Sequence, residues 1–231
     1  MKKILVTGGN SRFAKSLKKI NSNFAFIYTS KKQLDILKFK SLKNKIKKIK
    51  PKAILHLAGL SRPMSIHENE ISKSVDLNII GTANLVKVCS DLNIKLIYFS
   101  TSYVYEGTKG NYKEVDPVKP WNNYAWSKLG GECAVHMYKN SLILRVCMTE
   151  KPFVHKAAFA NVNTNFIFHE DLAKILIRLI NKKGVFNLGG PIKSIYDFAK
   201  MNNKKIKKIY SKGEFPLNPS MNINKLKKII K

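Results

Sequence analysis

The chain has 231 residues, of which 44% are hydrophobic and 25% are charged. This length and composition fit one globular domain and exclude a disordered chain. Its formal net charge is +29, and so strong a field attracts nucleic acid, anionic membrane or phosphate-bearing ligands. No apolar run reaches the roughly 18 residues that span a bilayer, and the first residues lack the pattern of a signal peptide. We therefore expect no membrane span and a cytoplasmic location.

The positive charge comes mostly from lysine, because only 4 of the 43 basic residues are arginine. The run KNKIKKIK (43–50) fits a helix with Ile46 and Ile49 facing inward and lysines facing solvent. A solvated surface is the favoured interpretation and nucleic-acid binding the minor one, because no aromatic-and-basic recognition module is present. Three widely spaced cysteines form neither a metal-ligand nor a disulfide pattern, so no metal is expected and the location is reducing.

Short β-rich apolar runs alternate with amphipathic helical stretches along most of the chain. Strands are expected at 3–8, 24–29, 53–59, 95–101 and 141–147, and helices at 11–20, 40–49, 71–91 and 123–139. After a less regular segment, a helix is expected at 170–180 and a strand at 184–190. This alternation predicts an α/β fold with a doubly wound parallel sheet, the Rossmann fold.

The first strand-to-helix turn, TGGNSRFA, has the form of a phosphate-binding loop. Gly8 and Gly9 supply a tight turn, while Ser11 and Ala14 stand where such loops usually have glycine. The Ser11 side chain is small and its hydroxyl can donate to a phosphate, and alanine is an accepted substitute at the helix-packing position. Taken alone, the loop fits an ordinary strand-to-helix turn equally well.

The end of the second strand bears on the choice of cofactor. An NAD site usually has an acidic residue there, whereas this chain has Ser30 and Lys31. These residues, with Arg12 approaching from the glycine loop, predict a site for a 2′-phosphate. NADP(H) is therefore favoured and NAD(H) remains the alternative, although lysines are common throughout this chain.

Tyr124 and Lys128 are four residues apart on a predicted helix, so their side chains share one face. A free tyrosine has a pKa of about 10, and a neighbouring ammonium lowers it toward the range of a useful general acid or base. Thr101 ends the fourth strand at the same carboxyl edge, where its hydroxyl can bind a substrate carbonyl. The pair alone is a common chance pattern, and its occurrence with Thr101 and the glycine loop at one sheet edge strengthens it.

These segments together resemble the extended short-chain dehydrogenase/reductases that act on sugar nucleotides, closest to the dTDP-4-dehydrorhamnose reductase branch. The resemblance covers nearly the whole length and is most specific in LIYFSTSYVYEGTKGNYKEVDPVKPWNNYAWSKLGGE (96–132). It also includes ILVTGGNSRFA, LDI (34–36), PKAILHLAG (51–59), DLNIIGTANLVKVC (76–89), LILR (142–145) and FIFHEDLA (166–173).

The resemblance implies Thr101, Tyr124 and Lys128 as the catalytic triad, with Tyr124 protonating the carbonyl oxygen as hydride arrives at carbon. It implies that Asn78 supports the active-site helix and a proton-relay water. The cofactor-binding residues that it implies are the loop Gly8, Gly9, Asn10, Ser11, Arg12 and Phe13, then Asp35 and Ile36 near adenine, and Leu57, Ala58 and Gly59 along the cofactor. Asn78, Tyr124 and Lys128 are also expected at the cofactor, because the Lys128 ammonium can donate to the ribose hydroxyls of a nicotinamide cofactor.

Two departures from the family limit what the resemblance implies about the substrate. Ser102 and Tyr103 stand where the dehydratase branch has two acids, so dehydration is disfavoured. The segment 146–165 is short for a substrate lobe. We expect a dinucleotide-binding Rossmann domain at 1–147 and a C-terminal part at 148–231. Within that part, 166–190 returns to the sheet, and 148–165 with 191–231 forms a small, shortened substrate lobe.

The favoured function is NADP(H)-dependent reduction of a keto-sugar nucleotide of the 4-keto-6-deoxy type. A sugar-nucleotide 4-epimerase with tightly bound NAD is the second interpretation, and a non-catalytic NADP-binding regulatory subunit is the third. Nucleic acid is not expected as a partner. The family often dimerises through helices that include the Tyr–Lys helix, so a homodimer is an open expectation.

Overall fold

A parallel sheet forms the centre of the molecule in the computed structural model, which describes residues 1–230. Within those residues the sheet has six strands in the order β10-β5-β4-β3-β1-β2, and every neighbouring pair is parallel. The strands are β1 (Lys2–Thr7), β2 (Phe24–Thr29), β3 (Ala53–His56), β4 (Lys95–Thr101), β5 (Ser141–Val146) and β10 (Gly184–Leu188). The predicted doubly wound fold is confirmed.

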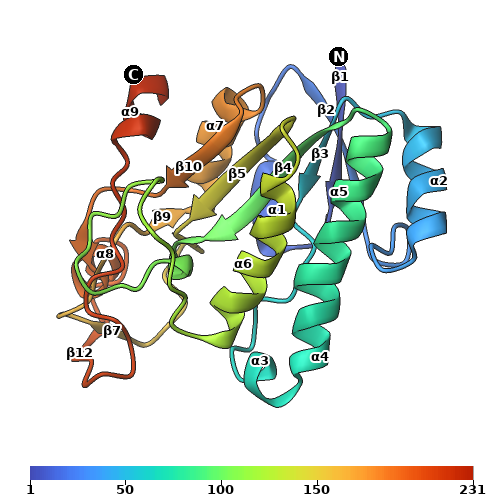
Figure 1. The fold of residues 1–231 in the computed structure, drawn as a ribbon. Coiled ribbons are helices and arrows are strands. Elements are labelled where there is room, and N and C mark those ends of the chain that lie inside the picture. Colours follow the sequence, from blue (N-terminus) through green and yellow to red (C-terminus); the bar gives the residue numbers. More distant parts are fainter. Residues whose placement is uncertain (231) are drawn as a thin grey trace.

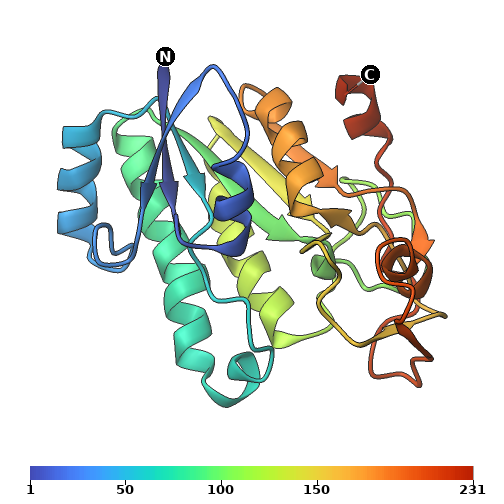
Figure 2. The same ribbon diagram turned by 180° about the vertical axis from the view of Figure 1, so that it is seen from behind.

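Helices cover both faces of this sheet. One face carries α2 (Phe39–Ile49), α5 (Gly81–Asp91) and α6 (Asn123–His136) (Figure 1). The other carries α1 (Arg12–Leu17), α7 (His169–Leu179) and α9 (Asn224–Ile230) (Figure 2). Successive side chains of β4 point to opposite faces of the sheet, as in any strand. Leu96 and Tyr98 pack in the apolar layer with α2, α5 and α6, whereas Ile97 and Phe99 pack in the layer with α1, α7 and α9.

The predicted helix at 71–91 is present, but its middle turn is wider than an α-helix. Helix α4 (Ile71–Ser74) follows the short α3 (Ile66–Asn69), and a π-helical segment, Val75–Ile80, joins α4 to α5. Such insertions occur often at functional sites because they re-aim one side chain. Here the inserted turn contains Asn78. The predicted helices at 11–20 and 123–139 are shorter than expected and end at Leu17 and His136.

A small lobe lies beyond the carboxyl ends of β4 and β5 (Figure 1). It contains β7 (Ala157–Phe159) paired with β12 (Lys207–Ile209), β8 (Asn163–Thr164) paired with β11 (Lys193–Ser194), and α8 (Ile195–Lys200). Its own apolar cluster includes Phe153, Ile195 and Phe198. The short strands β6 (Met148–Thr149) and β9 (Ile167–Phe168) join it to the main sheet. The domain boundaries given above remain a prediction.

Candidate active site

A cavity of about 240 Å³ opens at the carboxyl ends of the strands, where doubly wound sheets bind ligands. The loops after β1, β3, β4 and β5 contribute its walls, together with α6. Of the predicted site residues, it brings together Ser11, Arg12, Phe13, Leu57, Ala58, Gly59, Thr101, Tyr124 and Lys128. Segments that are more than 100 residues apart in the sequence therefore meet at one site, as the resemblance implied.

The turn after β1 is shaped so that only glycine fits its first two positions. Gly8 has φ +66°, and a Cβ there would lie 2.7 Å from the backbone nitrogen of Ala58. A Cβ on Gly9 would lie 2.8 Å from the backbone nitrogen of Thr29. The Ser11 hydroxyl accepts a hydrogen bond from the Ala14 amide at 3.2 Å and so caps α1. Its hydroxyl proton remains available to a phosphate, which reconciles Ser11 with a phosphate-binding turn.

The residues expected near the adenosine end lie outside the cavity lining. Ser30 is held in a turn by Gln33, whose side-chain oxygen accepts from the Ser30 amide at 2.9 Å and from its hydroxyl at 3.0 Å. Lys31 is exposed. Asp35 accepts from the Leu37 amide at 3.0 Å, and the Ile36 side chain is buried in the core against α5. Only the backbone of Ile36 can therefore face a ligand.

Tyr124 lines the cavity and is partly buried between two aromatic side chains. His67 and Tyr103 flank its ring, with ring centroids 5.1 and 6.2 Å away. Burial raises the pKa of Tyr124 to about 12, opposed by the Thr101 hydroxyl beside it and by the charge of Arg62. The tyrosine is therefore protonated at neutral pH in this state, as a proton donor must be.

Our expectation that Lys128 lowers the pKa of Tyr124 is wrong for this state. The Lys128 ammonium lies 4.2 Å from the centre of the Tyr98 ring, and the side chain is buried. Burial lowers the pKa of Lys128 to about 7, although the nearby Glu132 carboxylate opposes this. Lys128 is thus a weakened cation, and Arg62 is the cation whose charge acts on Tyr124.

Asn78 connects the loop after β3 to the helix that carries Tyr124. Its side-chain nitrogen donates to the Leu60 carbonyl at 2.9 Å and to the Ser127 hydroxyl at 2.8 Å, while its oxygen accepts from the Leu60 amide at 2.7 Å. Ser127 in turn donates to the Tyr124 carbonyl at 2.7 Å. Asn78 therefore holds α6 against the cavity wall, and its role with a relay water remains a prediction.

Sequence reasoning missed a group of charged residues at the edge of the cavity. Arg12 contacts Glu150 at 2.6 Å and Arg62 contacts the same carboxylate oxygen at 3.5 Å. His169 lines the cavity beside them. We had expected Arg12 to reach toward a 2′-phosphate held by Ser30 and Lys31. In this structure its side chain instead contacts Glu150. The available signal was the use of arginine in a chain that otherwise uses lysine.

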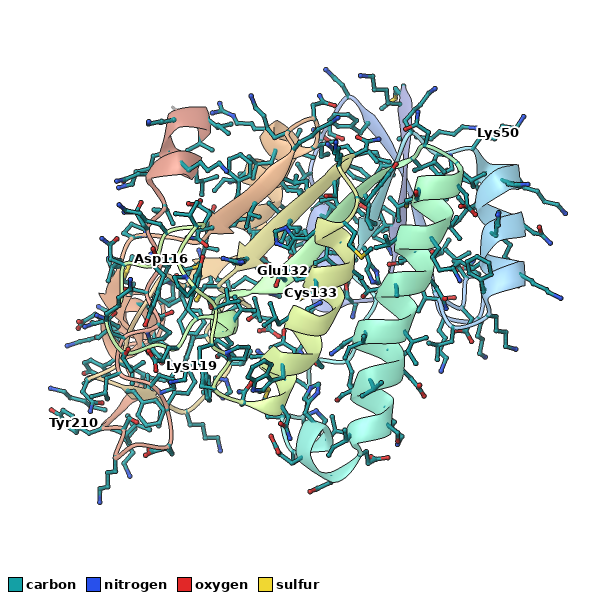
Figure 3. All side chains as sticks on the ribbon, in the orientation of Figure 1. Lys50, Asp116, Lys119, Glu132, Cys133 and Tyr210 are labelled. Carbon is teal, nitrogen blue, oxygen red and sulfur yellow. The ribbon has the colours of Figure 1, made fainter. Side chains whose placement is uncertain are left out.

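A second missed feature is the buried ion pair behind the cavity. Glu132 lies on α6 (Figure 3) and accepts from Arg145 of β5 at 2.6 Å, and both side chains are almost fully buried. Ser100 donates to the other oxygen of Glu132, and Arg145 also donates to the Tyr105 hydroxyl at 2.8 Å. The Arg145 in the apolar run LILRV was the signal, because a buried arginine requires a partner.

The fold and cavity define a Rossmann-type α/β protein with the Tyr–Lys arrangement of short-chain dehydrogenase/reductases. The sequence model of the family described as "RmlD substrate binding domain" matches residues 1–163. The chain belongs to this family, which confirms the resemblance to extended sugar-nucleotide enzymes.

Individual relatives are similar over different lengths. The chain is 36% identical over 114 residues to "Methionine adenosyltransferase 2 subunit beta" of Xenopus tropicalis, which covers 49% of this chain and 34% of that protein. It is 27% identical over 201 residues to "dTDP-4-dehydrorhamnose reductase" of Aggregatibacter actinomycetemcomitans, and the match covers 83% of this chain and 63% of that protein. The chain therefore spans about one third to two thirds of the length of these relatives.

The fold is that of a solved dTDP-4-dehydrorhamnose reductase from Bacillus anthracis in complex with NADP. The two agree with a TM-score of 0.87 over 99% of this chain and 92% of that one, at 22% identity. Among residues 1–230, no helix has the length and apolar character needed to cross a bilayer.

Proposed function

We propose that this protein is an NADP(H)-dependent reductase of a keto-sugar nucleotide. The observation that carries the proposal is a protonated Tyr124 beside Thr101 in a cavity that is also lined by Ser11 and Arg12 of the turn after β1. The relative named as a dTDP-4-dehydrorhamnose reductase and the solved relative with NADP support the reaction class and the cofactor.

The residues of the cavity fit a dinucleotide. Gly8 and Gly9 let the turn pack closely against the backbone of Ala58 and Thr29, and Ser11, which follows them, lines the cavity with a hydroxyl proton to donate. Leu57, Ala58 and Gly59 would lie along the cofactor, and Ser30 and Lys31 would hold a 2′-phosphate. When bound, the reduced nicotinamide supplies the hydride.

The chain itself supplies the proton and the orientation of the substrate. Thr101 hydrogen bonds the substrate carbonyl oxygen, and Tyr124 donates its phenolic proton to that oxygen as the carbonyl carbon is reduced. The charge of Arg62 stabilises the resulting phenolate. Lys128, with its pKa lowered to about 7, can also pass a proton toward the tyrosine.

Ser102 and Tyr103 stand where the dehydratase branch has two acids, so dehydration stays disfavoured. Ser102 is neutral. Burial raises the pKa of Glu150, but the hydrogen bond from its own backbone and the charges of Arg62, Arg12 and His169 outweigh this and hold that pKa below its ordinary value, so Glu150 remains a carboxylate. A 4-epimerase uses the same three residues, but it retains its dinucleotide through the cycle. Release of NAD from the denatured purified protein would favour that alternative.

Cofactor oxidation tests the proposal directly. The protein is incubated with NADPH and a panel of 4-keto-6-deoxy sugar nucleotides while absorbance at the nicotinamide band is followed. Turnover is expected with the wild type, and the Tyr124→Phe variant should bind NADPH with unchanged affinity but lose at least about 100-fold in turnover. A Tyr124→Phe variant with full turnover would exclude Tyr124 as the acid.

A regulatory subunit is the second candidate function. It is favoured by the similarity to a relative named as subunit beta of a methionine adenosyltransferase and by the short lobe. This candidate predicts NADPH binding by the wild type without turnover of any keto-sugar nucleotide.

We further propose that the protein forms a homodimer through the helices that carry Asn78 and Tyr124. Ile71, Val75 and Ile80 on the first segment and Trp126 on α6 are exposed apolar side chains. Light scattering on the eluted protein tests this proposal, and Trp126→Lys should shift a dimer toward the monomer. A wild type that is monomeric at micromolar concentration would contradict it.

A further inference from the structure

Three charged side chains from different loops meet at the edge of the cavity. Arg12 begins α1, Arg62 lies in the loop after β3, and Glu150 follows β6. One oxygen of Glu150 contacts Arg12 at 2.6 Å and Arg62 at 3.5 Å. All three side chains line the cavity.

This contact leaves much hydrogen-bonding capacity unused. The second oxygen of Glu150 is buried and has no hydrogen-bond partner within residues 1–230, so neither arginine forms a two-oxygen, forked pair with the carboxylate. A guanidinium presents five donors in a plane, and most of them remain available here. The Arg12 and Arg62 side chains are 50% and 41% exposed, so both can move, whereas Glu150 is 18% exposed.

The choice of residue type also indicates a specific ligand. Lysine is the usual cation of this chain, and arginine accounts for only 4 of 43 basic residues. Two of those four contact Glu150. Arginine differs from lysine in binding planar or tetrahedral oxyanions through two parallel hydrogen bonds. Two mobile arginines and one carboxylate also leave a net positive charge at the cavity edge.

We propose that Arg12 and Arg62 bind the diphosphate group of a nucleotide ligand, and that Glu150 is an internal counter-ion that this diphosphate displaces. The inference rests on the proposed function, because both the dinucleotide and a sugar nucleotide contain a diphosphate. Either source offers several oxygens and at least two negative charges, against the one oxygen that Glu150 now presents.

Displacement of Glu150 by a diphosphate also links ligand binding to Tyr124, the proposed proton donor. The charge of Arg62 acts on Tyr124 and on Glu150 alike. A ligand that draws Arg62 away from Glu150 therefore changes the field at Tyr124 in the same event.

Binding measured by calorimetry tests the displacement without any turnover. Inorganic pyrophosphate, NADPH and dTDP are titrated separately into the wild type and the Glu150→Gln variant. Glu150→Gln should bind pyrophosphate about tenfold more tightly, equivalent to ~1.4 kcal/mol, because no carboxylate then competes for the arginines. The matched control is Glu170→Gln on α7, which removes the same charge outside the cavity lining and should leave affinity unchanged.

A double-mutant cycle separates competition from a general change of charge. Arg62→Gln should weaken pyrophosphate binding more in the Glu150→Gln background than in the wild type, because the arginine is then free to bind. Additive effects, equal tightening by Glu170→Gln, or unchanged affinity of Glu150→Gln would each overturn the proposal.

The two larger ligands identify the source of the diphosphate. If Glu150→Gln binds NADPH more tightly than the wild type does, but binds dTDP equally well, the arginines bind the cofactor. If it binds only dTDP more tightly, they bind the substrate. Wild type that binds pyrophosphate as expected but not NADPH would refute the proposed function and leave this inference standing. Wild type that binds NADPH, with Glu150→Gln unchanged for all three ligands, would refute only the inference.

Discussion

Replacing Lys128 by methionine should stabilise the protein while abolishing reduction. The lysine is buried and its pKa is lowered to about 7 from an ordinary value of 10.5. At ~1.4 kcal/mol per pKa unit, this lowering corresponds to at most about 5 kcal/mol of unfavourable burial. Since a buried ammonium can relax toward the cavity, we expect a gain of about 2–4 kcal/mol. Methionine keeps the contact with the Tyr98 ring through its sulfur.

The size of the stability gain from Lys128→Met depends on pH. The folded protein binds the Lys128 proton more weakly than the unfolded chain, so wild-type stability rises between about pH 7 and 10.5. Its penalty is therefore largest at and below pH 7. The advantage of Lys128→Met should be complete at about pH 6.5 and shrink to about 1 kcal/mol or less near pH 9.5.

Urea unfolding of both proteins at these two pH values measures the difference. Near pH 7 the melting temperature should also rise by about 5–15 °C for a chain of this size. The exposed Lys174 provides a control, and its replacement by methionine should change stability by less than about 0.5 kcal/mol. A Lys128→Met advantage that is equal at both pH values, or a loss of stability at both, would refute the reasoning.

Three further substitutions test the architecture around the cavity. Glu132→Gln should lower the free energy of unfolding, measured in urea, by about 3–5 kcal/mol, because Arg145 would remain buried without its charged partner. A decrease below ~1 kcal/mol would contradict this. Gly8→Ala should cost about 2–4 kcal/mol and abolish pyrophosphate binding, because its Cβ meets the Ala58 backbone; retained binding would show that the turn is not where phosphate binds. Ser11→Gly should cost only a few tenths of a kcal/mol, because glycine is itself an adequate N-cap; a loss above ~1 kcal/mol would assign Ser11 a larger structural role.

The strands and the sheet edge could be predicted because they depend on local patterns. After Lys95, strand β4 has six apolar or hydroxyl residues ending at Thr101, and parallel strands place their carboxyl ends together. A glycine turn, a strand-end threonine and a Tyr–Lys pair at those positions therefore had to converge. The cavity lining contains Thr101, Tyr124 and Lys128, together with Ser11 and Arg12, which follow the two glycines of the turn.

The ion pairs could not be predicted because they join residues that no local pattern connects. Glu150 meets Arg12 across 138 residues of sequence, and its position depends on the irregular segment after β5. The π-helical turn that contains Asn78 could not be predicted either, because the spacing of its apolar residues is that of an ordinary α-helix. The pKa of Tyr124 was mistaken because helical spacing fixes a shared face, whereas the direction of the Lys128 ammonium depends on Tyr98 of a different element.

The distribution of unsatisfied polar atoms offers an independent argument that this cavity is the functional site. Within residues 1–230, five buried side-chain polar atoms have no hydrogen-bond partner, on His67, Ser102, Trp121, Glu150 and Glu170. Ser102 and Glu150 line the cavity, His67 packs on Tyr124, and Trp121 packs on Tyr103. Glu170 lies outside the cavity lining, but the other four atoms lie in it or on residues that pack against it. Each such atom costs about 1–3 kcal/mol in a folded protein, so folding alone gives no reason to gather four of them in one place. A site that binds a polar ligand does give one, because groups held ready for the ligand are those that the protein leaves unpaired. The same reasoning explains why the weakened cation Lys128 and the displaceable counter-ion Glu150 lie around one cavity.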